Sequence, residues 1–231
     1  MLEDHSAGEV TPTIINDYAF LDLLPDLTTI QSDNATYTAI YSHLPHTTTF
    51  LQPPDYTPAQ TITNRGLSIL KDDSRYHMTM ASFILLHKWF TFLKENGVYD
   101  NTRIILASDH GRGNTNYPGN ITLPDGGKLQ SYNALLMVKD FDVKDSDELS
   151  VDDSFMTNAD AALFAVQGID STNPFTGKAL VPDKADGIDI TTIGALSTYR
   201  HSKYGYNIDA DQWLGVHDNI FNHENWNKAG E

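Results

Sequence analysis

The stretch from Arg75 to Gly113 constrains the fold of this 231-residue chain more than any other, and it reads RYHMTMASFILLHKWFTFLKENGVYDNTRIILASDHGRG. Apolar residues recur at helical spacing through its first half, which predicts a mostly buried amphipathic helix. Asn96-Gly97 is expected to end that helix, because glycine readily adopts the left-handed conformation found at helix C-termini. Residues 103–107 (RIILA) then have the composition of a central parallel strand. The stretch therefore predicts a helix, a turn and a buried strand of an α/β protein.

The predicted strand runs directly into Ser108-Asp109-His110-Gly111. Open α/β sheets place their ligand sites at the carboxyl ends of strands, where these residues would lie. The carboxylate of Asp109 and the imidazole of His110 together suit Mn²⁺ or Zn²⁺, or Mg²⁺ where oxygen donors dominate. The same two residues also fit a capping Asp and a hydrogen-bonded His in an ordinary loop. Spacing alone favours neither interpretation.

The segment VYDNTRIILASDHG resembles the C-terminal metal-binding strand of the alkaline phosphatase superfamily. It is most similar to the membrane-anchored sulfatase-like branch, which includes phosphoglycerol transferases and lipoteichoic acid synthases, and the resemblance runs from about Tyr18 to Asn227. It implies the C-terminal part of an alkaline phosphatase-like α/β fold, with a mostly parallel sheet flanked by helices. Residues 1–17 would be a polar lead-in, and residues 18–231 would form one domain.

The resemblance also implies a metal, because the Asp-His pair of this family ligates the catalytic ion. Asp109 and His110 match that pair directly. We therefore expect them to bind a divalent cation, Mn²⁺ or Mg²⁺ first, with Ca²⁺ or Zn²⁺ as alternatives.

A second motif follows residues 36–41 (TYTAIY), whose β-branched and aromatic residues predict a strand. The family usually has Thr-His-Glu-Pro here, before a Leu-Gln-x-Pro-Asp-Tyr segment that FLQPPDYTP matches. His46 falls on the family's His, while Thr47 and Thr48 replace the Glu and the Pro. The resemblance implies that His46 contacts the anionic group of the substrate or assists proton transfer, with His43 as the alternative.

Three further elements are predicted downstream. Residues 132–139 (YNALLMVK) read as a buried strand, and residues 187–198 include a short apolar segment suited to a strand. A helix is expected from about residue 155 to Val166 and should end at Gly168. Thr157 and Asp160 approximate a capping box at its start.

The chain is strongly acidic, with 15 basic and 31 acidic residues and a formal net charge of −16. This charge argues against nucleic acid or an anionic membrane surface as the main partner. An anionic ester substrate would need local positive charge from a metal, Arg112, Arg75 or a protonated His. Four other histidines, His77, His87, His217 and His223, are expected to be structural. No apolar run approaches the about 18 residues of a membrane span, so a soluble chain is expected.

Residues 1–35 contain no strand, acid and Thr arrangement of the kind that carries the nucleophile in this superfamily. We therefore expect the C-terminal part of a longer membrane protein, facing the extracytoplasmic side, whose upstream part carries membrane helices and the nucleophile. The substrate would be a phosphate ester of phosphoglycerol or phosphoethanolamine type, or a sulfate ester, on a lipid head group or cell-envelope glycan. This part alone would bind metal weakly without turnover. The alternative is a non-catalytic extracellular binding domain that retains the fold.

Overall fold

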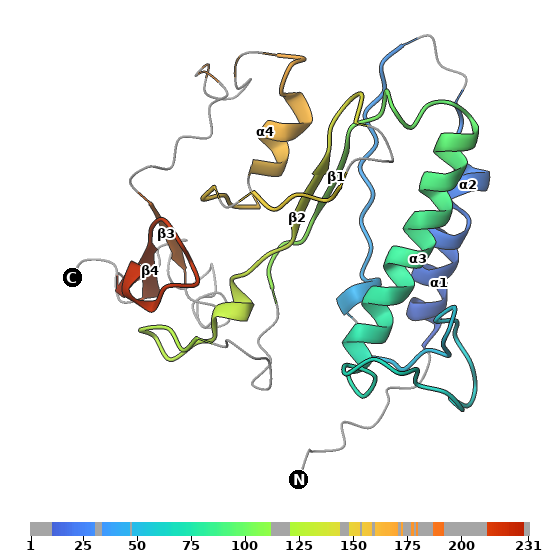
Figure 1. Ribbon diagram of the computed structural model, residues 1–231, viewed down its shortest axis with the longest axis horizontal. Coiled ribbons are helices and arrows are strands. Elements are labelled where there is room, and N and C mark those ends of the chain that lie inside the picture. Colours follow the sequence, from blue (N-terminus) through green and yellow to red (C-terminus); the bar gives the residue numbers. More distant parts are fainter. Residues whose placement is uncertain are drawn as a thin grey trace, which may run out of the picture. The chain divides into compact units, whose positions relative to one another are not determined.

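The computed structural model describes residues 11–30, 34–46, 48–111, 121–143, 148–152, 154–158, 160–170, 172, 177, 179, 187–191 and 212–228. The contacts divide the chain into two compact units, Met1–Thr102 and Arg103–Glu231. We call these unit 1 and unit 2 and describe each by itself (Figure 1). The single domain expected over residues 18–231 stays a prediction, since two compact units can belong to one domain.

Unit 1 is helical in its described part. It contains α1 (Pro12–Asp22), α2 (Leu24–Leu27), a 3-10 turn (Leu44–His46) and the long helix α3 (Ser74–Glu95). The first residues of α1 lie within residues 1–17, which were expected to be a polar lead-in. The helix begins there because Thr11 accepts a hydrogen bond from the Ile14 N–H and Pro12 occupies the first helical turn. Figure 1 shows α1 and α2 alongside α3.

Helix α3 confirms the helix predicted in the first half of the Arg75–Gly113 stretch. The Asp73 carboxylate caps its start by accepting a hydrogen bond from the Arg75 N–H. Gly97, just beyond the C-terminal end, has a φ of +69°, in the left-handed region expected of it. Side-chain bonds tie α3 to the first two helices, from Lys88 Nζ to Asp22 at 2.5 Å and from Trp89 Nε1 to Thr28 Oγ1 at 2.8 Å.

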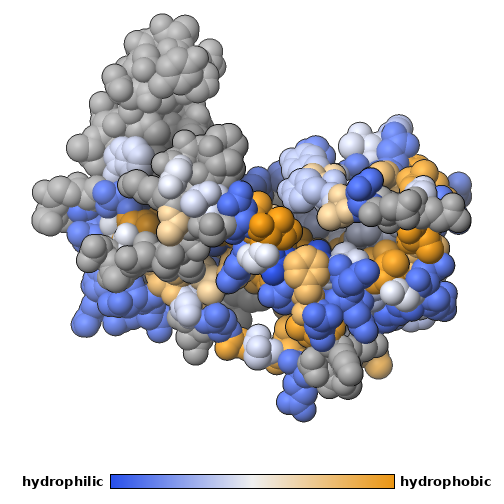
Figure 2. Space-filling view, turned by 90° about the horizontal axis from the view of Figure 1, so that it is seen from above, coloured by the Kyte–Doolittle hydropathy of each residue, from blue (hydrophilic) through white to orange (hydrophobic). Residues whose placement is uncertain are grey.

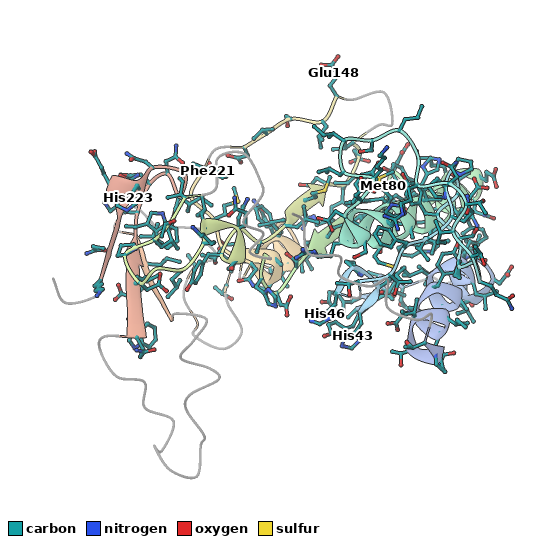
Figure 3. The ribbon with its side chains drawn as sticks, turned by 90° about the horizontal axis from the view of Figure 1, so that it is seen from below. His43, His46, Met80, Glu148, Phe221 and His223 are labelled. Atoms are coloured by element: carbon teal, nitrogen blue, oxygen red, sulfur yellow. The ribbon has the colours of Figure 1, made fainter. Side chains whose placement is uncertain are left out.

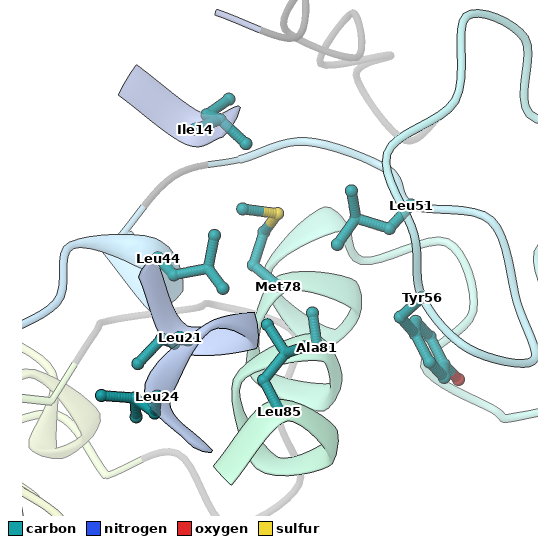
Figure 4. Close-up of a cluster of buried hydrophobic side chains, with 9 residues drawn as sticks. All are labelled: Ile14, Leu21, Leu24, Leu44, Leu51, Tyr56, Met78, Ala81 and Leu85. Atoms are coloured by element: carbon teal, nitrogen blue, oxygen red, sulfur yellow. The ribbon is translucent and has the colours of Figure 1, made fainter. Parts of the chain in front are cut away.

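The core of unit 1 lies where α3 packs against other segments of the unit (Figure 4). Its buried residues share apolar side chains and come from α1, α2, the 3-10 turn and the 51–56 segment as well as from α3. They are Ile14, Leu21, Leu24, Leu44, Leu51, Tyr56, Met78, Ala81 and Leu85.

His77 is also fully buried in unit 1, and both of its ring nitrogens contact main-chain carbonyls. Nδ1 lies 2.9 Å from the Leu51 oxygen and Nε2 lies 2.7 Å from the Lys71 oxygen. These bonds agree with the structural role expected for His77.

In its described part, unit 2 combines one short α-helix with two small sheets. Strand β1 (Ile104–Ala107) pairs with β2 (Leu136–Lys139), and Ile105 lies opposite Val138. Strand β4 (Trp213–Val216) lies between β3 (Ile188–Thr191) and β5 (Trp226–Lys228). The second sheet packs on a core of Leu123, Leu129, Leu214, Val216 and Trp226.

Helix α4 (Asp160–Val166) contacts β1 and is joined to it by Arg103. Arg103 Nη2 donates to Asp140 Oδ1 at 2.7 Å, and Nη1 donates to the carbonyls of Phe164 and Gln167. Its guanidinium also lies over the Phe141 ring, 4.5 Å from the centroid. One side chain thus joins β1, the residues after β2 and the C-terminal end of α4.

The mixed helix and strand composition agrees with the expected class, but the strand pairing differs. All three ladders between the named strands are antiparallel, whereas a mostly parallel sheet was expected. A short apolar run such as Ile-Ile-Leu-Ala fits either kind of buried strand, so the composition of β1 could not decide its direction. The strand predicted at residues 36–41 was wrong, because that segment is an exposed coil in which Tyr37 and Tyr41 are largely solvent-accessible.

No helix in the described part of the chain is long and apolar enough to cross a membrane. Exposed apolar side chains are nonetheless present, and Figure 2 shows them among polar residues on the face that it presents. The most exposed are Leu67 and Ile69, in the loop before α3.

Candidate functional site

Hydrogen bonds fix the main chain of the Ser108-Asp109-His110-Gly111 segment, which directly follows β1. Ser108 extends the ladder by one step, because its N–H donates to the Leu135 carbonyl at 2.9 Å. The Leu135 N–H in turn donates to Ser108 Oγ at 2.7 Å. The chain is therefore still fixed to the neighbouring strand when it reaches Asp109.

Gly111 fixes the other end of this segment through a close backbone approach. Its N–H donates to the Ser131 carbonyl at 3.1 Å. A Cβ at this position would lie 1.9 Å from the Gln130 oxygen and 2.5 Å from the Asn133 oxygen. Real Cβ atoms essentially never come within 3.0 Å of other heavy atoms, so the geometry requires glycine here.

The main chain of Asp109 is held by Asn158, which lies in the turn before α4. Asn158 Nδ2 donates to the Asp109 carbonyl at 2.6 Å and lies 3.4 Å from the Ser108 carbonyl. Asn158 precedes α4 in a turn in which the Asp160 carboxylate accepts from the Thr157 N–H at 2.6 Å and from Thr157 Oγ1 at 3.2 Å. The bond from the Thr157 N–H is one half of the predicted capping box, whereas the Asp160 N–H donates to the Thr157 carbonyl and not to its hydroxyl.

The side chains of Asp109 and His110 project from this backbone into solvent. Their exposed fractions are 80% and 52%, and His110 Nε2 lies 3.7 Å from Asp109 Oδ2. Asp109 Oδ1 accepts a hydrogen bond from the His110 N–H at 3.0 Å. The acid and the imidazole therefore lie side by side on the surface.

The tautomer of neutral His110 follows from its other contact. Nδ1 is hydrogen-bonded to the Gly111 carbonyl, which can only accept, so Nδ1 carries the hydrogen. This leaves a lone pair on Nε2, the nitrogen beside the carboxylate. A metal-binding His typically donates its second nitrogen to a carbonyl in this way.

Asp109 and His110 together fit a divalent cation by donor chemistry, one carboxylate oxygen and one imidazole nitrogen. Two donors are fewer than Mn²⁺ or Zn²⁺ takes in proteins. Among the described residues, no group of three or more His, Asp or Glu side chains is placed to hold a metal. Any further ligand would come from outside the described residues or from solvent.

His46 ends the 3-10 turn of unit 1 and His43 directly precedes this turn, and both residues are exposed (Figure 3). The His46 N–H donates to the His43 carbonyl at 2.9 Å, and Leu44 between them is fully buried. The Tyr41 hydroxyl lies 3.2 Å from His43 Nε2, and the two rings meet edge to face. Both His residues belong to unit 1, whereas Asp109 and His110 belong to unit 2. An approach of His46 to Asp109 and His110 therefore stays a prediction.

Of the other arginines and histidines considered from the sequence, Arg112 lies outside the described residues. Arg75 is hydrogen-bonded to Asp73, and His87 is exposed on α3. His217 pairs with Asp218 at 2.9 Å, and His223 lies on a 3-10 turn (Figure 3).

Sequence reasoning missed Asn158, which contacts the segment from 49 residues away. Asn beside a helix start is ordinarily assigned to capping, so its position in FMTNAD carries no signal of a distant partner. The hydrogen bonds of Ser108 to Leu135, beyond the end of β1, were missed as well.

No protein-family model, no curated protein and no solved structure matches this chain.

Proposed function

We propose that this chain is the C-terminal part of a metal-dependent sulfatase-like hydrolase or transferase that is inactive alone. The observation that carries the proposal is the exposed pair of Asp109 and His110, with Nε2 3.7 Å from the carboxylate at the end of β1. The substrate class is an ester of phosphate, of phosphoglycerol or phosphoethanolamine type, or of sulfate. The resemblance of VYDNTRIILASDHG to the metal-binding strand of the alkaline phosphatase superfamily supports this class.

The proposal includes the alkaline phosphatase-like fold with its larger parallel sheet. Among the described residues, β1 pairs with β2 alone, so its second edge could accept a strand from the upstream part of the protein. That upstream part would also supply the nucleophile. We place the whole protein at the extracytoplasmic face of a membrane, where its ester would belong to a lipid head group or a cell-envelope glycan.

Asp109 and His110 would hold Mn²⁺ or Mg²⁺ in this proposal, with Ca²⁺ or Zn²⁺ as alternatives. The ion would offset negative charge on the ester oxygens, which a chain of net charge −16 otherwise repels. His46 would orient the anionic group or transfer a proton, and His43 and Arg112 would bind the same group.

The direct test is isothermal titration of the chain with Mn²⁺. We expect binding in the wild type that is lost in the double variant Asp109→Ala/His110→Ala. The matched control is His217→Ala/Asp218→Ala, which removes a second exposed Asp-His pair of unit 2 in which the imidazole is already bonded to the carboxylate. Binding that survives the first double variant, or that disappears equally in the control, would overturn the metal site.

A binding domain without catalysis is the second candidate, and the departure from the family's His motif favours it. Thr47 and Thr48 stand where the family has Glu and Pro. Determining the upstream sequence separates the two candidates. A Thr or Ser after a strand-borne acid indicates phosphoryl transfer, a Cys there indicates sulfate esters, and neither indicates the binding domain.

A further inference from the structure

The side chain of Asn158 reaches the peptide unit that joins Asp109 to His110. Its Nδ2 donates to the Asp109 carbonyl oxygen at 2.6 Å, a short bond between an amide and a main-chain acceptor. The same nitrogen lies 3.4 Å from the carbonyl of Ser108, one residue earlier. Asn158 therefore contacts the main chain of the segment that carries the two proposed metal ligands.

This contact controls geometry that the ligands cannot control themselves. The carbonyl of Asp109 belongs to the planar peptide unit that joins the two residues, so holding its oxygen restrains the orientation of that plane, which is set by ψ of Asp109 and φ of His110. These two angles determine where the Cβ atoms of Asp109 and His110 point. Both side chains are more than half exposed, so little packing restrains them from outside.

The bonds at the start of the helix beside Asn158 come from Thr157, Asp160 and the main chain of Asn158, whose carbonyl accepts from the Ala161 N–H at 3.2 Å. The start of α4 is stabilised by the bonds from Thr157 to Asp160, whose carboxylate is almost completely buried. Asn158 directs its amide away from α4 and towards the end of β1. Thr157 and Asp160 thus anchor the turn, and Asn158 extends from it to the segment.

We propose that Asn158 is a positioning residue that holds Asp109 and His110 in the orientation in which they bind a divalent cation. The inference rests on the metal site of the proposed function. An outer partner of metal ligands typically contributes about 10- to 100-fold in metal affinity. We expect the lower end of that range, because Asn158 acts through the main chain of the ligands.

The experiment compares the Mn²⁺ affinity of the wild type, Asn158→Leu and Thr157→Val by isothermal titration. Leucine has nearly the size of asparagine but no donor, whereas Thr157→Val removes only the 3.2 Å hydroxyl bond of the same turn and keeps the main-chain N–H that donates to Asp160 at 2.6 Å. We expect about 10-fold weaker binding for Asn158→Leu and unchanged binding for Thr157→Val. The thermal midpoint of each variant is measured alongside, and we expect the two variants to lose similar amounts of stability.

A second measurement needs no metal. The His110 amide belongs to the same peptide unit as the Asp109 carbonyl, so its ¹H–¹⁵N resonance should move in Asn158→Leu and stay in place in Thr157→Val. Wild-type affinity in Asn158→Leu, or an equal loss in Thr157→Val, would overturn the positioning role alone. Wild-type Mn²⁺ binding that does not depend on Asp109 and His110 would overturn the metal site and the positioning role together.

Discussion

Replacing His77 by leucine tests the most completely enclosed polar group described in unit 1. The imidazole is fully buried and lies between the carbonyls of Leu51 and Lys71, at 2.9 and 2.7 Å. It thereby connects α3 to two segments that precede it in the chain. Three rings also meet it edge to face, and these are Phe50, Tyr56 and Tyr76.

The cost of His77→Leu follows from these contacts. Even a neutral imidazole carries one N–H, so at least one of the two carbonyls loses its donor. A buried acceptor left without a partner costs about 1–3 kcal/mol, and each lost aromatic contact costs up to about 1 kcal/mol. We therefore expect the free energy of unfolding of unit 1 to fall by about 2–4 kcal/mol.

Urea unfolding followed by tryptophan fluorescence measures this change. Trp89 is the one tryptophan of unit 1, so a Trp213→Phe/Trp226→Phe background makes the signal specific to that unit. With an m-value of about 2 kcal/mol per molar urea, the midpoint should fall by about 1–2 M. The matched control is His87→Leu, which makes the same change at an exposed position of α3 and should cost less than about 0.5 kcal/mol.

A His77→Leu midpoint within about 0.3 M of the reference would contradict the reasoning, since it would mean that neither carbonyl depends on the imidazole. An equal loss in His87→Leu would contradict it as well, because the effect would then belong to the helix rather than to the buried bonds.

Two further predictions concern unit 2. Gly111→Ala should lower the thermal midpoint, since the new Cβ would lie 1.9 Å from the Gln130 carbonyl oxygen. The same substitution should weaken Mn²⁺ binding, because it displaces the neighbouring residues Asp109 and His110. An unchanged midpoint by calorimetry would contradict the close approach. Burial raises the pKa of Asp140, but hydrogen bonds from Arg103 and the Phe141 N–H, with the charges of Arg103 and Lys139, outweigh it and leave the pKa below the ordinary 3.8. Because the folded state lowers this pKa, the carboxylate stabilises unit 2 above about pH 4 and that contribution is lost as the pH falls through the folded value. The difference in thermal midpoint between the wild type and Asp140→Asn should therefore be largest near pH 6 and shrink below pH 4, and a difference independent of pH would contradict the assignment.

The elements that sequence reasoning predicted well are those encoded by neighbouring residues. The apolar spacing of α3 and its Asn96-Gly97 ending are local signals, and the structure confirms both. The interaction between Thr157 and Asp160 spans three residues and was predicted for the same reason. The start of α1 had a local signal too, since Thr11-Pro12 is a typical helix beginning, although residues 1–17 were expected to be a polar lead-in.

What could not be predicted depends on partners distant in the chain. The direction of β1 is set by the strand that pairs with it, about 30 residues later, and its own residues fit either direction. Residues 36–41 have strand-forming side chains, but they pair with no other strand among the described residues. The bond from Asn158 to Asp109 likewise joins residues that no local pattern connects.

The Ser108–Gly111 segment separates the residues that shape the backbone from those that face solvent. Ser108, Asn158 and the Gly111 N–H hold the path of the chain with bonds that do not involve the side chain at position 109 or 110, whereas the Gly111 carbonyl accepts from the imidazole of His110. Substitutions at these two positions should therefore leave the fold almost untouched. Over evolutionary time only selection on chemistry would keep an acid and an imidazole there, and an engineer could exchange both for other donors on the same scaffold.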